Sequence, residues 1–166
     1  AEEYPTHPIE IVCPNAPGGG SDMHTRALVA VGAQYFGQPL IPVIRSGATG
    51  TVGTAYVANS KPDGYTLLLG EQGSVIVLPL VETLPYKTED LIPIGQISSV
   101  PMVYFVLSSS PWKTLKEFIE DAKKRPLKIR YASAGMYGVD HLSMEALSQM
   151  AGIKLTHMPT GGAGPA

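Results

Sequence analysis

Three adjacent glycines, residues 18–20, join an apolar segment to a helical pattern near the amino end of the chain. The preceding residues 9–13 are short, rich in β-branched side chains and bounded by prolines, so they predict a buried strand. Glycines at a strand-to-helix junction let the backbone approach a ligand closely, and Ser21 or Asp22 can cap the helix. The unpaired N–H groups and the positive dipole end of that helix then face the loop, which predicts a site for a carboxylate or phosphate.

The glycines do not match the familiar nucleotide-binding motifs. The chain contains no G-x-x-x-x-G-K-[ST], and its three glycines are adjacent rather than spaced as G-x-G-x-x-G. Nucleotide binding is therefore disfavoured. A glycine-rich turn that only reverses the chain is the alternative to an anion site.

Composition excludes several classes of partner. The chain has 166 residues, of which 44% are hydrophobic and 16% charged, as is typical of a globular protein. A formal net charge of −2 gives no basic field for nucleic acid, and no apolar stretch is long enough to span a membrane. We therefore expect no nucleic-acid partner and no direct membrane insertion. The single Cys13 cannot form an internal disulfide and the four histidines are scattered, so we expect no metal and no cofactor.

Apolar runs alternate with helical patterns along most of the chain. The predicted helices are residues 22–36, 51–59, 115–124 and 140–150, the third of them starting with a capping box from Thr114 to Glu117. The predicted strands are residues 9–13, 40–44, 65–69, 91–97, 102–107, 128–132 and 154–157. This alternation predicts an α/β fold with a parallel sheet covered by helices on both faces.

The strand-like pattern breaks at residues 98–101 and resumes with no helix between. One interpretation is that the chain crosses here from a first lobe, residues 1–100, to a second lobe, residues 101–166. An irregular edge strand around Pro101 would produce the same pattern.

Two further glycine loops follow predicted strands. After residues 128–132 comes a loop of small residues that opens into a helix, as in the first loop, and ligands bind at such carboxyl ends of strands. A third glycine loop follows residues 154–157 and the sequence then stops. Because such a loop normally precedes a helix, we expect this chain to be the front portion of a longer protein.

Catalysis is disfavoured by the same residues. Asp22 adjoins Ser21 and lies near His24, and Asp140 adjoins His141, but G-x-S-x-G is absent and neighbours in sequence point in different directions. We therefore expect no enzyme. A small α/β hydrolase or transferase acting on an anionic substrate through Ser21, Asp22 or His141 is the alternative.

Several blocks of sequence together resemble one receptor family. They are Tyr4-Pro5 with Pro8-Ile9, residues 14–22, 47–53, 62–70 and 84–86, Ser133-Ala134-Gly135 with His141, and Gly164-Pro165-Ala166. In this order they resemble the solute-binding receptors of tripartite tricarboxylate transporters, also called Bug or TctC-like proteins. The resemblance covers essentially the whole chain.

The resemblance implies a periplasmic-binding-protein-like flytrap of two lobes, with parallel-rich sheets flanked by helices. Members are about twice as long, and their first lobe is completed by carboxyl-terminal segments, so this chain would be truncated. It implies a periplasmic receptor, its signal peptide already removed, that captures a small organic acid for the membrane subunits of a transporter. A sensor using the same lobes is an alternative.

The resemblance also implies which residues bind the ligand, mainly through backbone amides and bridging waters. In the first lobe they are Asn15, Ala16, Pro17, Gly18, Gly19, Gly20, Ser21, Asp22, Gly47, Glu71, Gln72, Gly73 and Ser74. In the second lobe they are Ser133, Ala134, Gly135, Tyr137, Asp140, His141, Thr160, Gly161, Gly162 and Ala163.

The chain departs from its relatives at Asn15, at Glu71-Gln72 and at Thr160-Gly161. A carboxylate at Glu71 is unfavourable near an anion unless it points away or meets a cationic group such as an ammonium. The identity of the acid is therefore left open.

Overall fold

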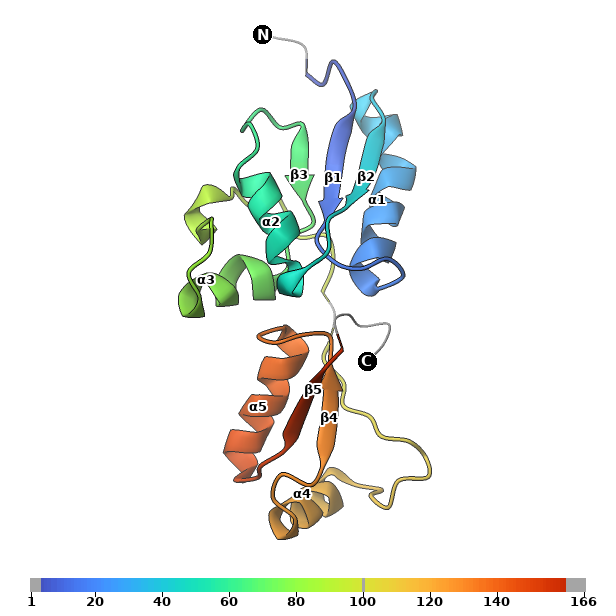
Figure 1. The fold of residues 1–166 in the computed structure, drawn as a ribbon. Helices are drawn as coiled ribbons and strands as arrows, with labels where there is room; N and C mark the ends of the chain where they lie inside the picture. Colours follow the sequence, from blue (N-terminus) through green and yellow to red (C-terminus); the bar gives the residue numbers. More distant parts are fainter. Residues whose placement is uncertain (1–3, 100, 161–166) are drawn as a thin grey trace.

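The computed structural model describes residues 4–99 and 101–160. In chain order the elements are β1 (Ile9–Cys13), α1 (Gly20–Phe36), β2 (Leu40–Ile44), η1 (Ala48–Gly50), α2 (Thr51–Ala58), β3 (Thr66–Leu68), η2 (Gly73–Val77), α3 (Leu78–Val81), η3 (Thr88–Asp90), α4 (Leu115–Lys124), β4 (Arg130–Ser133), α5 (Val139–Ala151) and β5 (Thr156–Pro159). We call the elements from β1 to η3 the first lobe and those from α4 to β5 the second lobe (Figure 1).

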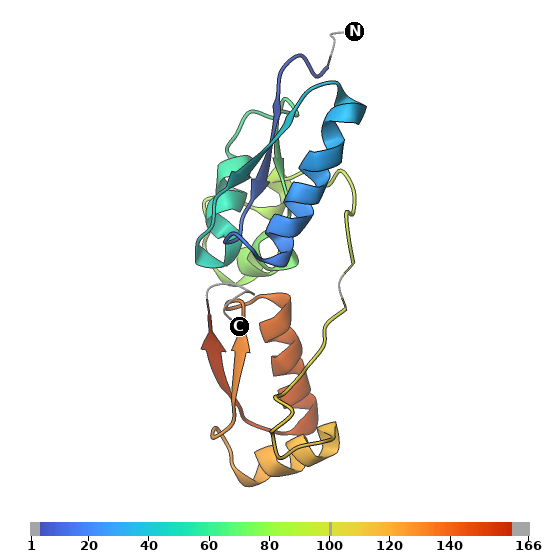
Figure 2. The same cartoon turned by 90° about the vertical axis from the view of Figure 1, so that its right-hand side faces the viewer.

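The first lobe is built on a three-stranded parallel sheet in the order β2-β1-β3. Central strand β1 is buried because its Ile9 and Ile11 pack with Leu40 of β2, and each such side chain contributes about 1.5–3 kcal/mol. Helix α1 approaches this sheet closely at Gly32, where a Cβ would lie 2.1 Å from Leu40 Cδ1. Figure 2 shows α1 on one side of the sheet and α2 on the other, as the alternating sequence pattern predicts.

The second lobe has a separate parallel pair, β4 and β5, joined through α5. Its core consists of Ala122, Ile129 and Ile153. Trp112 and Phe118 pack against this core, and their two rings meet edge to face. Helix α4 begins at the predicted capping box. The Thr114 hydroxyl accepts the Glu117 N–H at 3.2 Å, but the Glu117 carboxylate reaches one residue further back than expected, to the N–H of Lys113.

Two predicted strands are wrong. Residues 91–97 and the described residues from 101 to 107 contain no strand and run as an extended segment along one side of the molecule (Figure 2). Their apolar side chains are largely exposed: Ile92 85%, Ile94 81% and Phe105 87%. The apolar pattern was recognised, but a strand also needs a neighbour to take its backbone hydrogen bonds, and the described residues do not supply one.

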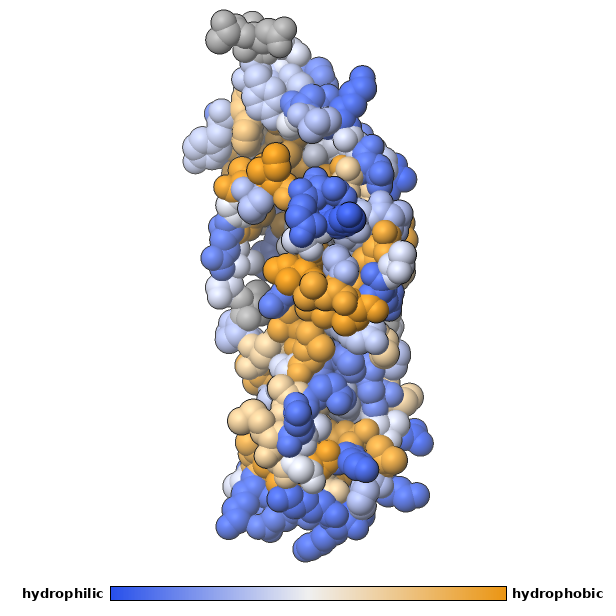
Figure 3. All heavy atoms as spheres, turned by 90° about the vertical axis from the view of Figure 1, so that its left-hand side faces the viewer, coloured by the Kyte–Doolittle hydropathy of each residue, from blue (hydrophilic) through white to orange (hydrophobic). Residues whose placement is uncertain are grey.

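The sequence pattern also missed a helical segment, η2 followed by α3. From residue 75 to residue 81 the segment is apolar throughout and contains Pro79, so it shows no helical periodicity. Figure 3 shows apolar side chains gathered at the level of α3, where η2 and α3 expose Ile76, Leu80 and Val81. Among the described residues, no helix combines the length and the apolar character that crossing a membrane requires.

The two sheets point their carboxyl ends toward each other (Figure 1). Strands β1 and β3 end at the lower edge of the first lobe, and β4 and β5 end at the upper edge of the second. The loops that follow these strands therefore meet between the lobes, where ligands bind in α/β folds. The predicted lobe boundary at residues 100 and 101 includes Val100, which lies outside the described residues, so the boundary stays a prediction.

Candidate functional site

The first glycine loop is held by Asp22 from within α1. Its Oδ2 accepts the Gly18 N–H at 2.9 Å, and its Oδ1 pairs with Arg26 Nε at 2.9 Å. The Gly18 N–H above all, and then the Arg26 guanidinium, hold the pKa of the Asp22 carboxyl below its ordinary value of 3.8. Gly18 has φ of 82°, a left-handed conformation that suits glycine.

Helix α1 begins two or three residues earlier than a cap at Ser21 or Asp22 requires. Its N-cap is Gly19, with no side-chain hydrogen bond, so neither Ser21 nor Asp22 caps the helix. Both lie inside the first turn instead, and Asp22 reaches back to the loop. The start of α1 faces the junction, and no N-cap side chain takes its first N–H groups. These N–H groups and the positive end of the helix dipole favour an anion there.

Asn15 and Ser21 connect this loop to the loop after β3. Asn15 Nδ2 donates to Glu71 Oε1 at 2.6 Å and to Ser21 Oγ at 3.1 Å. The Ser21 hydroxyl donates to the same Glu71 oxygen. Three of the predicted site residues, far apart in sequence, are thus brought together in one network.

Other predicted first-lobe residues lie around this network. Ala16 and Pro17 belong to the same loop, Gln72 is exposed, and Gly47 is exposed at the start of η1 with φ of 143°. Ser74 is buried in the scaffold, where Thr54 Oγ1 donates to its hydroxyl at 3.0 Å and the Tyr86 hydroxyl donates to its carbonyl at 2.6 Å.

The second-lobe loop folds over the start of α5 in a similar way. Asp140 accepts the N–H groups of Ala134 and His141, and His141 Nδ1 accepts the Tyr137 N–H at 3.1 Å. The N-cap is Gly138, with no side-chain hydrogen bond. A second helix start without a side-chain cap therefore lies at the lobe junction (Figure 1), where Gly138 lies close to Gly73 of η2.

The rings of three residues pack together next to this loop, and we call Tyr131, His141 and His157 the ring cluster. His141 lies against His157 of β5 with ring centroids 4.2 Å apart, and His157 stacks on Tyr131 at 5.0 Å. Burial, and then the neighbouring His141, lower the pKa of His157 below its ordinary value of 6.5. Buried Ser133 hydrogen-bonds to His157 Nε2 and donates to the Gly135 carbonyl, so it holds the loop in place.

The described part of the third loop joins the second. Thr160 donates both its N–H and its hydroxyl to the Ser133 carbonyl, at 3.0 and 2.9 Å. The predicted contacts Gly161, Gly162 and Ala163 lie outside the described residues.

The two lobes touch at three of the predicted contact residues, Gly73, Gly135 and Tyr137, and at Thr49. A Cβ on Gly135 would lie 3.0 Å from Thr49 Oγ1, and a Cβ on Gly73 would lie 3.3 Å from the Tyr137 carbonyl oxygen. Thr49 and Tyr137 both have positive φ, 54° and 60°, conformations that cluster at binding sites. Thr49 and His157 were missed. For Thr49 the available signal was its place inside Gly47-Ala48-Thr49-Gly50, and for His157 its place just before the third loop.

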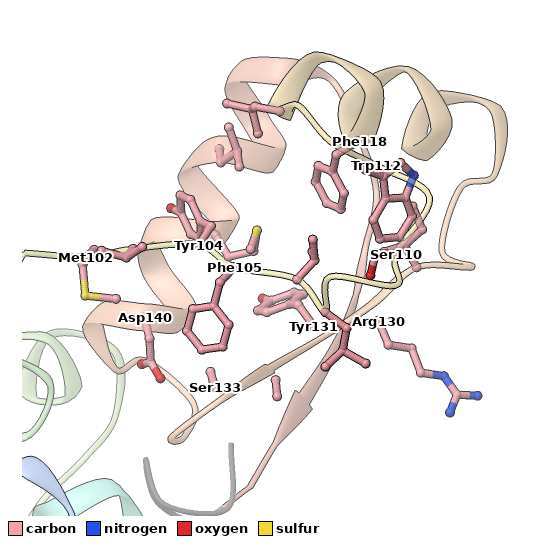
Figure 4. Close-up of a pocket in the computed structure, with 18 of the residues that line it drawn as sticks. Met102, Tyr104, Phe105, Ser110, Trp112, Phe118, Arg130, Tyr131, Ser133 and Asp140 are labelled. Atoms are coloured by element: carbon pink, nitrogen blue, oxygen red, sulfur yellow. The ribbon is translucent and has the colours of Figure 1, made fainter.

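A separate apolar groove of about 910 Å³ lies within the second lobe (Figure 4). It runs between the extended segment, α4, α5 and β4, and its walls include Phe105, Trp112 and Phe118. Ser133 and Asp140 lie at the end of this groove nearest the first lobe (Figure 4). Its apolar walls differ from the backbone-rich loops that suit a small anion.

Within residues 4–99 and 101–160, no group of three His, Cys, Asp or Glu side chains is placed to hold a metal ion. Ser133 and His157 are in contact, but Ser133 is only 1% exposed and is bound to its own loop.

Two parallel α/β lobes with strand ends and helix starts facing one junction define the class of periplasmic binding proteins. The fold matches a structure described as a periplasmic transporter, with a TM-score of 0.81 and 32% identity over 99% of this chain. The sequence profile described as "Tripartite tricarboxylate transporter family receptor" matches residues 25–166. The chain belongs to this family, whose members are solute-binding receptors and not enzymes, and the sequence resemblance is thereby confirmed.

Individual relatives agree with this assignment. Protein BugT of Bordetella pertussis is 34% identical over 100% of this chain and 52% of its own length. A structure from R. palustris with adipate is 32% identical, with a TM-score of 0.91 over 98% of this chain and 55% of that one. MatC from Rhodopseudomonas palustris with bound malate is 29% identical, with a TM-score of 0.87 over 98% of this chain and 56% of that one. The chain thus spans about half the length of the relatives it matches.

Proposed function

We propose that this chain forms part of a periplasmic receptor that captures a small organic acid between two lobes, residues 1–100 and 101–166. The observation that carries the proposal is the pair of uncapped helix starts, α1 at Gly19 and α5 at Gly138, that face one junction. The backbone N–H groups at these two helix starts favour a carboxylate without any metal or cofactor, although the Asp140 carboxylate already accepts the His141 N–H of α5. Two structural relatives solved with adipate and malate support the same ligand class.

We assign ligand contacts to the loops after β1, β3, β4 and β5. Backbone N–H groups of residues 15–20 and 133–137 supply these contacts, except at Pro17, which has no N–H, and at Gly18, Ala134 and Tyr137, whose N–H groups are held within the protein. Asp22, Asp140 and His141 hold these loops in shape through the hydrogen bonds described above. Closure of the lobes around the acid would be the signal read by membrane subunits of a transporter, as the name of the family suggests.

The test uses the full-length protein and a panel of mono-, di- and tricarboxylates. At a ligand concentration of about 100 times Kd, binding should stabilise the folded state by roughly 2.7 kcal/mol, seen as a selective rise in melting temperature. The key variant is Gly19→Leu. The nearest atom to a Cβ at Gly19 is the Ala16 carbonyl oxygen at 3.7 Å, so the variant should fold while its side chain covers the helix start.

Gly95→Leu is the matched control, because Gly95 lies in the exposed segment with no atom within 4 Å of a Cβ. We expect Gly19→Leu to abolish the ligand-induced shift and Gly95→Leu to retain it. A wild-type protein that melts cooperatively but responds to none of the acids would overturn the proposed function. Turnover of an ester, lost on changing His141, would favour the enzyme alternative.

A further inference from the structure

Glu71 places a carboxylate in the proposed anion site. It lies in the loop after β3, two residues before Gly73, which packs against the Tyr137 carbonyl of the second lobe. Its side chain is partly buried beside the first glycine loop. A negative charge here opposes a ligand that is itself wholly negative.

The other carboxylates of the site are occupied by protein groups. Asp22 pairs with Arg26, and each of the two Asp140 oxygens accepts a backbone N–H group. Arg45, the other arginine near these loops, lies over the Tyr56 ring, 4.0 Å from its centroid. Within the described residues, no lysine, arginine or histidine forms an ion pair with Glu71.

The neighbours of Glu71 fix its orientation. Asn15 and Ser21 both donate to Oε1, and no described residue donates to Oε2. The carboxylate is thus held by neutral donors on one oxygen, with its charge uncompensated and its second oxygen available to a donor from a ligand. A network that only tied the two loops together could use an uncharged glutamine instead.

The site therefore favours opposite charges at two different places. The starts of α1 and α5 favour a negative group, and Glu71 favours a positive one. We propose that the ligand is an amino carboxylate, with its carboxylate on the glycine loops and its ammonium on Glu71, and that Glu71 discriminates against dicarboxylates. This proposal rests on the proposed function and names its substrate class.

Specificity of this kind combines attraction with repulsion. A second carboxylate directed at Glu71 meets a like charge in a partly buried site, whereas an ammonium gains a charge-assisted hydrogen bond. An uncharged alkyl end gains no charge-assisted hydrogen bond, and it removes water from Glu71 without supplying a polar group in its place. The order of affinity should therefore be ammonium first and carboxylate last.

The experiment compares ligands that differ only at the far end of the same three-carbon spacer. Calorimetry on the full-length protein measures γ-aminobutyrate, valerate and glutarate, which end in an ammonium, a methyl and a carboxylate. Equivalent sets with shorter and longer spacers cover other site lengths, and norvaline against valerate tests an amino group next to the carboxylate. We expect at least one amino acid to bind about tenfold or more tightly than its neutral and dicarboxylate counterparts.

Glu71→Gln keeps the shape and removes the charge. It should reduce the preference for the amino ligand to within about threefold and strengthen dicarboxylate binding, while Glu89→Gln, an exposed glutamate of η3, should leave both unchanged. Dicarboxylates or neutral acids that bind wild type as tightly as every amino member would overturn the role of Glu71 and leave the carboxylate receptor intact. Absence of binding by every acid in the panel would overturn the proposed function itself. The wild-type comparison decides the question even if the glutamine variant does not fold.

Discussion

Gly135 of the second lobe lies so close to Thr49 of the first that a Cβ at residue 135 would be 3.0 Å from the threonine hydroxyl oxygen and 3.2 Å from its methyl carbon. The two residues belong to loops that follow strands of different sheets. Their contact is a direct point at which the lobes meet, and it leaves no room for a larger residue at position 135 unless Thr49 moves. This contact between the lobes therefore depends on the absence of a side chain at residue 135.

Gly135→Ala should weaken ligand binding by about tenfold, since overpacking a close contact costs on the order of 1–3 kcal/mol. Thr49→Ala removes the two contacting atoms, so adding it to Gly135→Ala should restore most of the affinity. Calorimetric titration with the best carboxylate of the panel measures both effects. Wild-type affinity in the single variant, or no recovery in the double variant, would show that closure does not use this contact.

Gly53→Ala should destabilise the first lobe by about 1–3 kcal/mol. A Cβ at Gly53 would lie 2.8 Å from the Arg45 carbonyl oxygen and 2.9 Å from Pro14 Cα, and both are backbone atoms that cannot rotate away. Urea unfolding compares this variant with Gly95→Ala, where no atom lies within 4 Å. Equal midpoints for the two variants would contradict the close approach of α2 to the end of β1.

His157 should make folding stability depend on pH. Its folded pKa lies below the ordinary 6.5, so the unfolded chain binds a proton first as the pH falls. The contribution of His157 to the free energy of unfolding is therefore present above pH 6.5, is lost as the pH falls from there toward the folded pKa, and changes no further below it.

Chemical unfolding between about pH 7 and pH 5 measures this slope. His157→Gln should flatten it, whereas His24→Gln, on α1 and away from the ring cluster, should leave the His157 contribution in place. An unchanged slope in His157→Gln would assign the pH dependence to other groups.

In a protein consisting of these 166 residues alone, the extended segment at residues 91–97 and 101–107 should promote self-association and dye binding. Ile94 and Phe105 are extended, apolar and without strand partners among the described residues, and such surface binds dyes and other chains. Ile94→Lys with Phe105→Lys should lower ANS fluorescence and self-association in sedimentation. Met150→Lys, at an exposed apolar residue of α5, is the control and should have a smaller effect; equal effects would remove the special role of the segment.

Local rules predicted much of the fold. Strand β1 and helix α4 lie where the apolar pattern and the capping box put them, because alternation and capping act within a few residues. The same rules failed for residues 91–97, 102–107 and α3. Pairing partners for an extended segment and the burial that allows an apolar helix come from elsewhere in the chain, so a short window of sequence does not contain them.

The candidate site was likewise predicted only in part from the sequence. Its glycine loops at the carboxyl ends of strands were visible in the sequence because the strand, the glycines and the following helix are contiguous. The network of Asn15, Ser21 and Glu71 was not visible, because it joins residues 50 and 56 positions apart. The Glu71 departure raised the question of charge, and only the fold supplied the two donors that orient the carboxylate.

The sequence by itself determined the α/β class, the receptor family and the loops that present backbone N–H groups, since each depends on contiguous residues or on their order along the chain. The tertiary structure decided which of those loops meet. It brought Thr49 to Gly135, packed His141 against His157 and left Glu71 without a cationic partner among the described residues, because distances between lobes and the balance of charge in a site are set by how the elements pack.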